Sequence, residues 1–290
     1  MAAILLDGRA AAAKIWEEVK AEVAHLRARL IVPKLVAVLI GDNPAAVVYA
    51  RSKEKTCGQA GIDFTLFNLP GTTTEKELLN LIDKLNRDNS VHGIMLEMPL
   101  PGHMNKQRLT EAIFPKKDVD GAHPLNRGYI LSGTDALFPV TPQSCIELMV
   151  HSGVKIEGKN AVIVGRGETV GKPLIFMMLN QNATVTVCHT KTADLSYHTR
   201  RADILIVAVG RAKLIKAGMV KPGAVVVDAG INEGEGGICG DVDFENVKEV
   251  AGAISPVPGG VGSLTTVLIQ KNLLKAVKLQ RIGFSDGRNL

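Results

Sequence analysis

The alternation of short apolar runs with longer helical patterns is the feature that most constrains how this chain can fold. In the second half, the apolar runs fall at residues 160–164, 184–188, 204–209 and 224–228. Runs of this length, rich in Val and Ile, predict buried strands, and helices between successive strands require parallel pairing. The sequence therefore predicts an α/β fold whose parallel sheet is covered by helices on both faces.

The first half shows the same alternation. Strands are predicted at residues 34–40, 63–67 and 93–97, with helical patterns at residues 10–30 and 45–60. Two separate stretches of strand–helix alternation in one chain of 290 residues favour two domains of ordinary size.

Capping residues mark some of the helix boundaries. Asp7 can cap the first helix, and Thr74 begins another helix with Glu77 three residues later, which is the capping-box spacing. The last long helical pattern, at residues 263–279, carries a stripe of Leu and Val. We expect this helix to pack back onto the first domain.

Composition argues against several classes of protein. Apolar residues make up 46% of the chain and charged residues 22%, which is a globular composition. The formal net charge of +5 is spread along the chain, so we expect no nucleic-acid partner. A modest positive field would still suit a small anionic ligand.

The cysteines indicate a reducing compartment. None of the four is at C-x-x-C spacing or in a Cys/His cluster, so a zinc site is not expected. They are Cys57, Cys145, Cys188 and Cys239. The apolar run at residues 1–6 is too short for a signal peptide, and no stretch approaches the ~20 apolar residues of a membrane span. We therefore expect a cytoplasmic protein with no membrane segment.

A glycine-rich turn follows the strand predicted at residues 160–164. Gly165, Gly167 and Gly171 give the spacing G-x-G-x-x-x-G, one residue longer than the usual dinucleotide fingerprint. Glycines let the backbone approach a phosphate, and a helix N-terminus offers N–H groups to it. A magnesium-nucleotide P-loop is rejected, because its spacing differs and Pro173 stands where Ser or Thr would bind the metal. We expect a dinucleotide site here.

The residues around this turn favour NADP over NAD. An NAD site usually has an acidic residue at the end of the next strand, whereas this chain has His189, Thr190 and Lys191 after Cys188. Arg166 lies within the turn, and a guanidinium group suits a 2′-phosphate.

Two groups of polar residues stand out in the first half. Tyr49 and Lys53 are four apart on a predicted helix and share a face. The pair could serve proton transfer, but the spacing alone favours an amphipathic surface helix. Asp118, Asp120 and His123 resemble metal ligands, but no other His lies nearby in the sequence, and we expect no metal.

Taken together, the motifs resemble the bifunctional methylenetetrahydrofolate dehydrogenase/methenyltetrahydrofolate cyclohydrolase family. The matching segments include residues 48–53, 93–101, 117–128, 171–173, 187–189, 221–223, 228–232, 240–242 and 256–262. The resemblance implies an N-terminal α/β folate-binding domain at residues 1–139, a Rossmann-type dinucleotide-binding domain at residues 140–264, and a C-terminal helix at residues 265–290 that packs on the first domain.

The resemblance also implies roles for individual residues. Tyr49 would stack on the folate rings, Lys53 would handle the proton of the cyclohydrolase step, and Asp120 would hydrogen-bond the pterin. The loop bearing Pro258, Gly259 and Gly262 would lie beside the nicotinamide and the folate. Catalytic candidates are thus Tyr49, Lys53, Glu97 and Asp120, and cofactor-binding candidates are Gly165, Arg166, Gly167, Val170, Gly171, His189, Thr190 and Ile231.

The implied function is oxidation of 5,10-methylenetetrahydrofolate with NADP, followed by hydrolysis to 10-formyltetrahydrofolate. The partners would be one-carbon derivatives of tetrahydrofolate, and the resemblance implies a homodimer formed through the dinucleotide domain. Another Rossmann dehydrogenase acting on an amino or hydroxy acid would not need this set of motifs. A non-catalytic folate- or dinucleotide-binding relative remains an alternative.

Several positions depart from the family pattern. Glu97 stands where the family usually has Gln, near the lysine. An ionised Glu97 would favour charged Lys53 and make it a poorer base, so one hypothesis is a dehydrogenase whose cyclohydrolase step is weakened. The alternative is that Glu97 is protonated or turned away. Val140, Gly167 and the pair Ser263-Leu264 also differ from the family residues.

Overall fold

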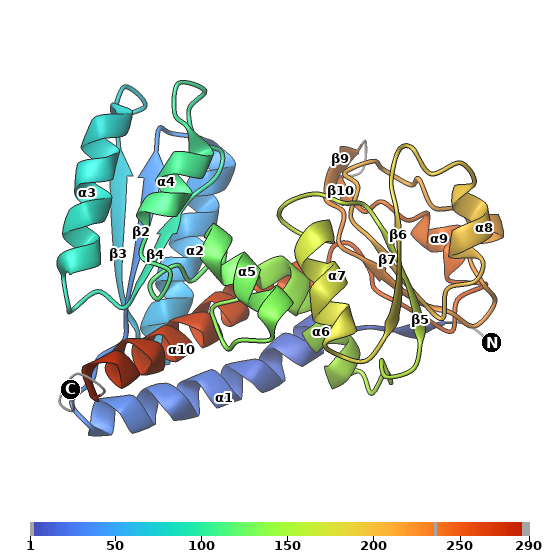
Figure 1. Cartoon of the computed structure of the whole chain (residues 1–290), viewed down its shortest axis with the longest axis horizontal. Helices are drawn as coiled ribbons and strands as arrows, with labels where there is room; N and C mark the ends of the chain where they lie inside the picture. Colours follow the sequence, from blue (N-terminus) through green and yellow to red (C-terminus); the bar gives the residue numbers. More distant parts are fainter. Residues whose placement is uncertain (1–2, 235–236, 286–290) are drawn as a thin grey trace. The chain divides into compact units, whose positions relative to one another are not determined.

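The computed structural model describes residues 3–234 and 237–285, which divide into two compact units (Figure 1). The three-stranded unit comprises Trp16–Phe138 and Ile269–Leu290, and the six-stranded unit comprises Met1–Ile15 and Pro139–Leu268. The sequence placed residues 1–139 in one domain, so the two divisions differ over the first fifteen residues.

The three-stranded unit is built on a parallel sheet with the strand order β3-β2-β4. The strands are β2 (Lys34–Ile40), β3 (Asp63–Leu69) and β4 (Gly93–Leu96). Residues on β2 are buried almost throughout because this central strand is covered on both faces.

Helices cover both faces of this sheet. Val36, Val38 and Ile40 pack with apolar side chains of α3 (Glu75–Arg87) and α4 (Lys106–Ala112). On the other face, a Cβ added to Gly93 would lie 2.7 Å from the Leu273 side chain of α10, so only glycine lets the helix approach so closely. The remaining helices are α2 (Pro44–Ala60), α5 (Pro124–Ser132), and most of α1 (Gly8–Ala28) and α10 (Thr265–Ser285).

Within this unit, α1 and α10 lie side by side (Figure 1). Lys278 pairs with Glu22 at 2.8 Å, and the Gln280 amide donates to the carbonyl groups of His92 and Lys116 at 2.8 and 3.0 Å. The last helix is therefore tied to the N-terminal edge of β4 and to the segment that precedes Asp118.

The six-stranded unit contains a parallel sheet with the order β1-β11-β8-β7-β5-β6. Its strands are β1 (Ile4–Leu5), β5 (Asn160–Val164), β6 (Thr184–Cys188), β7 (Ile204–Val207), β8 (Val225–Asp228) and β11 (Ala253–Ile254). Its helices are α6 (Val140–His151), α7 (Gly171–Leu179), α8 (Leu195–Thr199), α9 (Phe244–Val247), and the 3₁₀ turns η1 (Ala217–Met219) and η2 (Val261–Ser263). Strands β9 (Asn232–Gly234) and β10 (Gly237–Cys239) form a separate antiparallel pair.

The strand predictions are confirmed with small changes at their ends. The strand predicted at residues 204–209 ends at Val207, because the N–H groups of Val209 and Gly210 donate to the Asp241 carboxylate at 2.6 and 3.0 Å instead of to a neighbouring strand. Residues 115–142 are rich in Gly, Pro and Asp, a composition that ordinarily indicates a loop, yet they contain α5. His123 caps that helix by accepting from the Leu125 N–H, and Pro124 occupies its first turn.

Within the described residues, no helix is both long and apolar enough to cross a membrane.

Candidate active site

A buried ion pair lies at the carboxyl end of β4 in the three-stranded unit. The Lys53 ammonium group, on α2, is 2.8 Å from Oε1 and 2.7 Å from Oε2 of Glu97, the residue that follows β4. Both side chains are about 95% buried, since Lys53 is 4% and Glu97 5% exposed. Burial of such a pair is tolerated only because each charge has the other as a partner.

Tyr49 shares the helix face of Lys53, as the four-residue spacing predicts. Its ring centroid is 4.9 Å from the Lys53 ammonium, and the ring is half exposed. An ammonium group over an aromatic ring is attracted by the electron-rich face. The ring thus combines a fixed orientation with a surface that is open to a planar ligand.

Asp120 adds a carboxyl group whose ionisation is perturbed. Burial raises its pKa to about 6, and Asp118 and Glu97 add to this effect while Lys53 and Lys106 oppose it. A carboxyl group with this pKa changes its protonation state close to neutral pH.

The neighbouring Asp118 has a structural role. Its carboxylate accepts from the His123 N–H at 2.7 Å and from the Asn126 amide at 2.9 Å, and burial raises its pKa. Asp118 and His123 are thus occupied by the loop and by α5. Among the residues that the structure describes, no group of three or more His, Cys, Asp or Glu side chains is arranged to hold a metal.

The glycine-rich turn connects β5 to α7 in the six-stranded unit, as the sequence predicts. Gly165 has φ +120°, and a Cβ there would lie 2.1 Å from the Ala208 carbonyl oxygen. A Cβ on Gly171 would lie 2.3 Å from the Gly165 carbonyl oxygen. Both positions therefore require glycine, and together they bring the start of α7 against the end of β5.

The turn fits a dinucleotide phosphate. Val170 occupies the N-cap of α7 and makes no side-chain capping bond in the described structure. The Lys172 N–H donates to the Gly167 carbonyl at 3.0 Å and Pro173 has no N–H, so the Gly171 N–H is the first-turn donor that a ligand can use. Space around Gly167 is open, with no heavy atom of the described residues within 4 Å of an added Cβ, and Arg166 is exposed beside it.

The other cofactor-binding candidates lie in the same unit. The His189 ring accepts from the Lys191 N–H at 3.1 Å just after β6, and Thr190 beside it is exposed. Ile231, which precedes β9, is 67% exposed. An apolar side chain so exposed is available to a flat ligand ring.

The loop bearing Pro258, Gly259 and Gly262 also belongs to this unit. The Gly259 carbonyl accepts from the Gly8 N–H at 2.9 Å, and a Cβ on Gly8 would lie 2.0 Å from the Gly260 carbonyl oxygen. The start of α1 therefore packs against this loop and holds its backbone in place. Pro258 and Gly262 remain exposed.

Sequence reasoning missed two buried carboxylates at the carboxyl edge of the six-stranded sheet. Asp241 accepts from three successive N–H groups after β7, at 2.6 to 3.0 Å. Asp228 accepts from the Gly230, Asp241 and Val242 N–H groups, and burial raises its pKa to about 6. Both residues lie in segments that resemble the family, but their hydrogen-bonding role could not be predicted, because the bonds join loops far apart in sequence.

Two family models match the chain in succession. The catalytic domain of tetrahydrofolate dehydrogenase/cyclohydrolase matches residues 6–120, and its NAD(P)-binding domain matches residues 139–281. The chain belongs to the tetrahydrofolate dehydrogenase/cyclohydrolase family. This membership confirms the resemblance inferred from the sequence motifs and the predicted α/β fold with its dinucleotide-binding domain.

Relatives of this family match over nearly the full length. The bifunctional protein FolD of Pelotomaculum thermopropionicum is 64% identical over 96% of this chain and 98% of its own length. The crystal structure of the bifunctional FolD dehydrogenase/cyclohydrolase of Campylobacter jejuni is 46% identical, with a TM-score of 0.93 over 96% of this chain and all of that chain. The Trypanosoma brucei FolD structure, complexed with NADP and an inhibitor, is 33% identical, with a TM-score of 0.90 over 97% of this chain and 99% of that chain.

Proposed function

We propose that this protein oxidises 5,10-methylenetetrahydrofolate to 5,10-methenyltetrahydrofolate with NADP and hydrolyses the product to 10-formyltetrahydrofolate. The observation that carries the proposal is the full-length match to bifunctional relatives in a chain that also brings Tyr49, Lys53, Glu97 and Asp120 into one site. A dehydrogenase of another class would not require the site that these four residues form.

NADP is the preferred cofactor. The Trypanosoma brucei relative binds it, and the exposed Arg166 offers a guanidinium group for the 2′-phosphate. The first turn of α7 would hold the pyrophosphate, with Gly165 and Gly171 permitting close approach. When bound, the nicotinamide supplies the acceptor for a hydride from the methylene carbon.

The protein's own contribution to the first step is orientation. The half-exposed ring of Tyr49 offers a stacking surface for the planar folate rings, and ionised Asp120 can accept hydrogen bonds from the N–H groups of the pterin. Fixing the ring system from two sides aligns the methylene carbon for transfer.

The second step requires a proton acceptor. Water adds to the cationic methenyl carbon, one C–N bond of the ring breaks, and one proton is released overall. Lys53 lies in the site and can take a proton only when its amine is neutral. Both carboxylate oxygens of Glu97 hold the Lys53 nitrogen at 2.7–2.8 Å, so we propose that Glu97 slows hydrolysis relative to hydride transfer.

An initial-rate assay tests the first step. Methylenetetrahydrofolate is mixed with the protein and with either NADP or NAD, and the reduced cofactor is followed by absorbance. We expect turnover with both cofactors and none in a control without the folate. The kcat/KM should be higher for NADP than for NAD. No turnover with either cofactor would exclude the proposed oxidation.

We also propose a cytoplasmic homodimer whose subunits associate through the six-stranded unit. The four cysteines are free thiols, which suits a reducing compartment, and Ile238 on β10 is 54% exposed on that unit. Sedimentation velocity should give twice the chain mass, and Ile238→Lys should lower it toward one chain. A monomer at all concentrations would contradict the dimer.

A further inference from the structure

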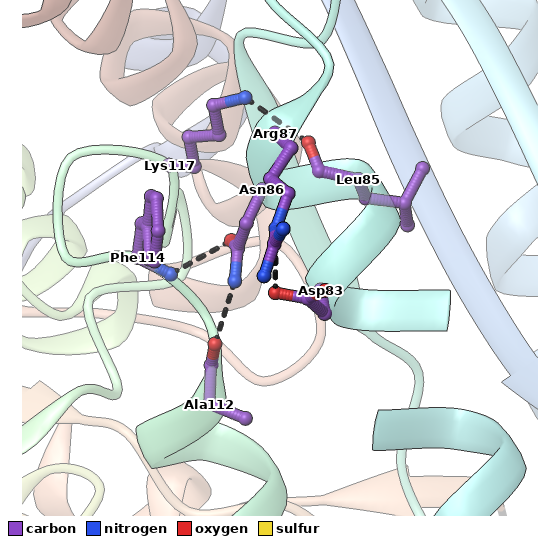
Figure 2. Close-up of polar contacts among 7 residues, drawn as sticks. All are labelled: Asp83, Leu85, Asn86, Arg87, Ala112, Phe114 and Lys117. Atoms are coloured by element: carbon purple, nitrogen blue, oxygen red, sulfur yellow. Dashed lines mark hydrogen bonds and ion pairs between the residues drawn. The ribbon is translucent and has the colours of Figure 1, made fainter. Parts of the chain in front are cut away.

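A buried lysine outside the ion pair holds the C-terminal end of α3. Lys117 is 5% exposed, and its ammonium group donates to the carbonyl oxygens of Leu85 at 3.0 Å and Asp88 at 2.7 Å. Figure 2 shows this side chain reaching from its loop to the last turn of the helix. Burial lowers the pKa of Lys117, while Asp88 opposes the shift. A buried ammonium group is costly, and the free carbonyl groups of a helix end reduce that cost.

Asn86 makes the reciprocal connection from the same helix end. Its amide donates to the Ala112 carbonyl at 2.7 Å, and its side-chain oxygen accepts from the Phe114 N–H at 2.9 Å. Asn86 is 5% exposed, and Figure 2 shows it pointing from α3 between these two backbone groups. Asn86 and Lys117 thus form a two-way clamp between α3 and the segment at residues 112–117.

The clamped segment leads directly to Asp120. The Phe114 carbonyl accepts from the N–H groups of Lys117 and Asp118 at 2.7 and 3.1 Å, which closes a tight turn. The Lys117 carbonyl then accepts from the Ile94 N–H on β4 at 2.7 Å, and Ile94 pairs with Asp118 in parallel. The Asp118 carbonyl then accepts from the Gly121 N–H at 3.1 Å, so Asp120 lies in the turn that directly follows the bridge to β4.

We propose that the Asn86–Lys117 clamp positions Asp120, so that the Asp120 carboxyl group lies where it can bind the folate. The inference rests on the proposed function, because it concerns the ligand of that same site. We expect neither Asn86 nor Lys117 to contact the folate. They act by fixing the segment at residues 112–117, which determines where Asp120 emerges beside β4.

The matched control is at the other end of α3. Thr74 accepts from the Glu77 N–H at 3.3 Å, and the Glu77 carboxylate accepts from the Thr74 N–H at 2.8 Å. Thr74→Ala removes this capping box and weakens the same helix without changing any contact of the clamp. Any effect shared by Thr74→Ala and Asn86→Ala therefore belongs to helix stability alone.

The experiment compares Asn86→Ala, Lys117→Met and Thr74→Ala with the unchanged protein. For each we would measure Tm, the KM values for methylenetetrahydrofolate and NADP, and the pH dependence of kcat/KM. All three should have a lower Tm. Only the two clamp variants should have a raised KM for the folate, by up to about 100-fold, because a displacement of about 1 Å in a binding group has effects of that size. The KM for NADP should not change.

The pH profile separates positioning from stability. In the unchanged protein, kcat/KM should fall as the pH drops through about 6, where Asp120 becomes protonated among Asp118, Lys53, Glu97 and Lys106. Loss of the clamp loosens the segment at residues 112–117 and lets water reach Asp120. The fall of kcat/KM at acid pH should therefore move to lower pH in the clamp variants and stay in place in Thr74→Ala.

If Asn86→Ala and Thr74→Ala have equal KM values for the folate and the same fall of kcat/KM at acid pH, the inference is overturned. Asn86→Ala decides the matter if Lys117→Met does not fold. Asp120→Asn distinguishes this failure from a failure of the proposed function. If Asp120→Asn raises the folate KM and Asn86→Ala does not, only the clamp is wrong; if Asp120→Asn has no effect, the assignment of Asp120 to the folate is wrong.

Discussion

The Lys53–Glu97 pair is the main residue-scale feature of the site in the three-stranded unit. A glutamine in place of Glu97 would hydrogen-bond Lys53 without a full negative charge. The carboxylate instead contacts the ammonium group with both oxygens in a site from which water is largely excluded. Coulombic attraction between opposite charges is strong in such surroundings, so the pair holds the Lys53 nitrogen against Glu97.

Glu97→Gln should increase the rate of methenyltetrahydrofolate hydrolysis by about tenfold, a fraction of the ~10²–10⁴ that a positioned base contributes. Without the carboxylate, Lys53 loses its counter-ion and is no longer held by two charged oxygens, which frees its nitrogen for the proton transfer of hydrolysis. Hydrolysis is followed by loss of methenyl absorbance.

Glu54→Gln is the matched control for that substitution, since Glu54 pairs with Arg51 at 2.9 Å on the exposed side of the same helix. It should leave the rate unchanged. Equal rates of hydrolysis in Glu97→Gln and in the unchanged protein would show that Glu97 does not limit the second step.

Asp120 also predicts a pH dependence of stability. Its pKa in the folded protein, about 6, exceeds the ordinary value of 3.8, so the folded state binds a proton more tightly than the unfolded state. The stabilisation from the protonated carboxyl group is complete below about pH 4 and is lost as the pH rises through 6. Urea unfolding should therefore show that Asp120→Asn gains stability relative to the unchanged protein between pH 4 and 6. A constant difference over that range would contradict this assignment.

The sequence was informative about single residues only where a local pattern existed. The spacing of Tyr49 and Lys53 predicted their shared helix face, and Glu97 was singled out because it departs from a motif. Asn86 could not be found in this way, because its partners are backbone groups of Ala112 and Phe114 more than twenty residues away. Its position on α3 resembles that of any polar residue at a helix end.

At the scale of elements, the strands were well predicted because burial on both faces leaves continuous runs of Val, Ile and Leu. The runs at 34–40, 160–164 and 184–188 match β2, β5 and β6 at both ends. Helix α5 has a weak local signal because it is short and lies among Gly, Pro and Asp residues that ordinarily indicate loops. Its start depends on the side chain of His123, an uncommon cap.

The turn between β5 and α7 provides a test at this scale. Gly165→Ala should destabilise the six-stranded unit by about 3 kcal/mol or more, because the new methyl group meets the Ala208 carbonyl oxygen and φ is +120°. Gly167→Ala is the matched control, since its Cβ would enter open space and should cost less than about 1 kcal/mol. Thermal unfolding of both variants measures the difference. Similar losses in the two variants would contradict the close packing of Gly165.

At the scale of the whole molecule, the function divides between the two units. The three-stranded unit carries the ion pair, Tyr49 and Asp120, and the six-stranded unit carries the glycine-rich turn and the loop at residues 258–262. The sequence placed the first strand with the folate-binding domain. Pairing of Ile4 with Ala253 and of Leu5 with Ile254, about 250 residues later, assigns β1 to the six-stranded sheet, and no local sequence pattern predicts such a pairing.

The most direct test of the account follows both products of a single reaction. The unchanged protein is incubated with methylenetetrahydrofolate and NADP, and NADPH and 10-formyltetrahydrofolate are quantified together over time. We predict that both form, with methenyltetrahydrofolate accumulating early because the second step is the slower one. NADPH that forms with an equal and lasting amount of methenyltetrahydrofolate, and no 10-formyl product above the uncatalysed rate, would contradict a bifunctional enzyme.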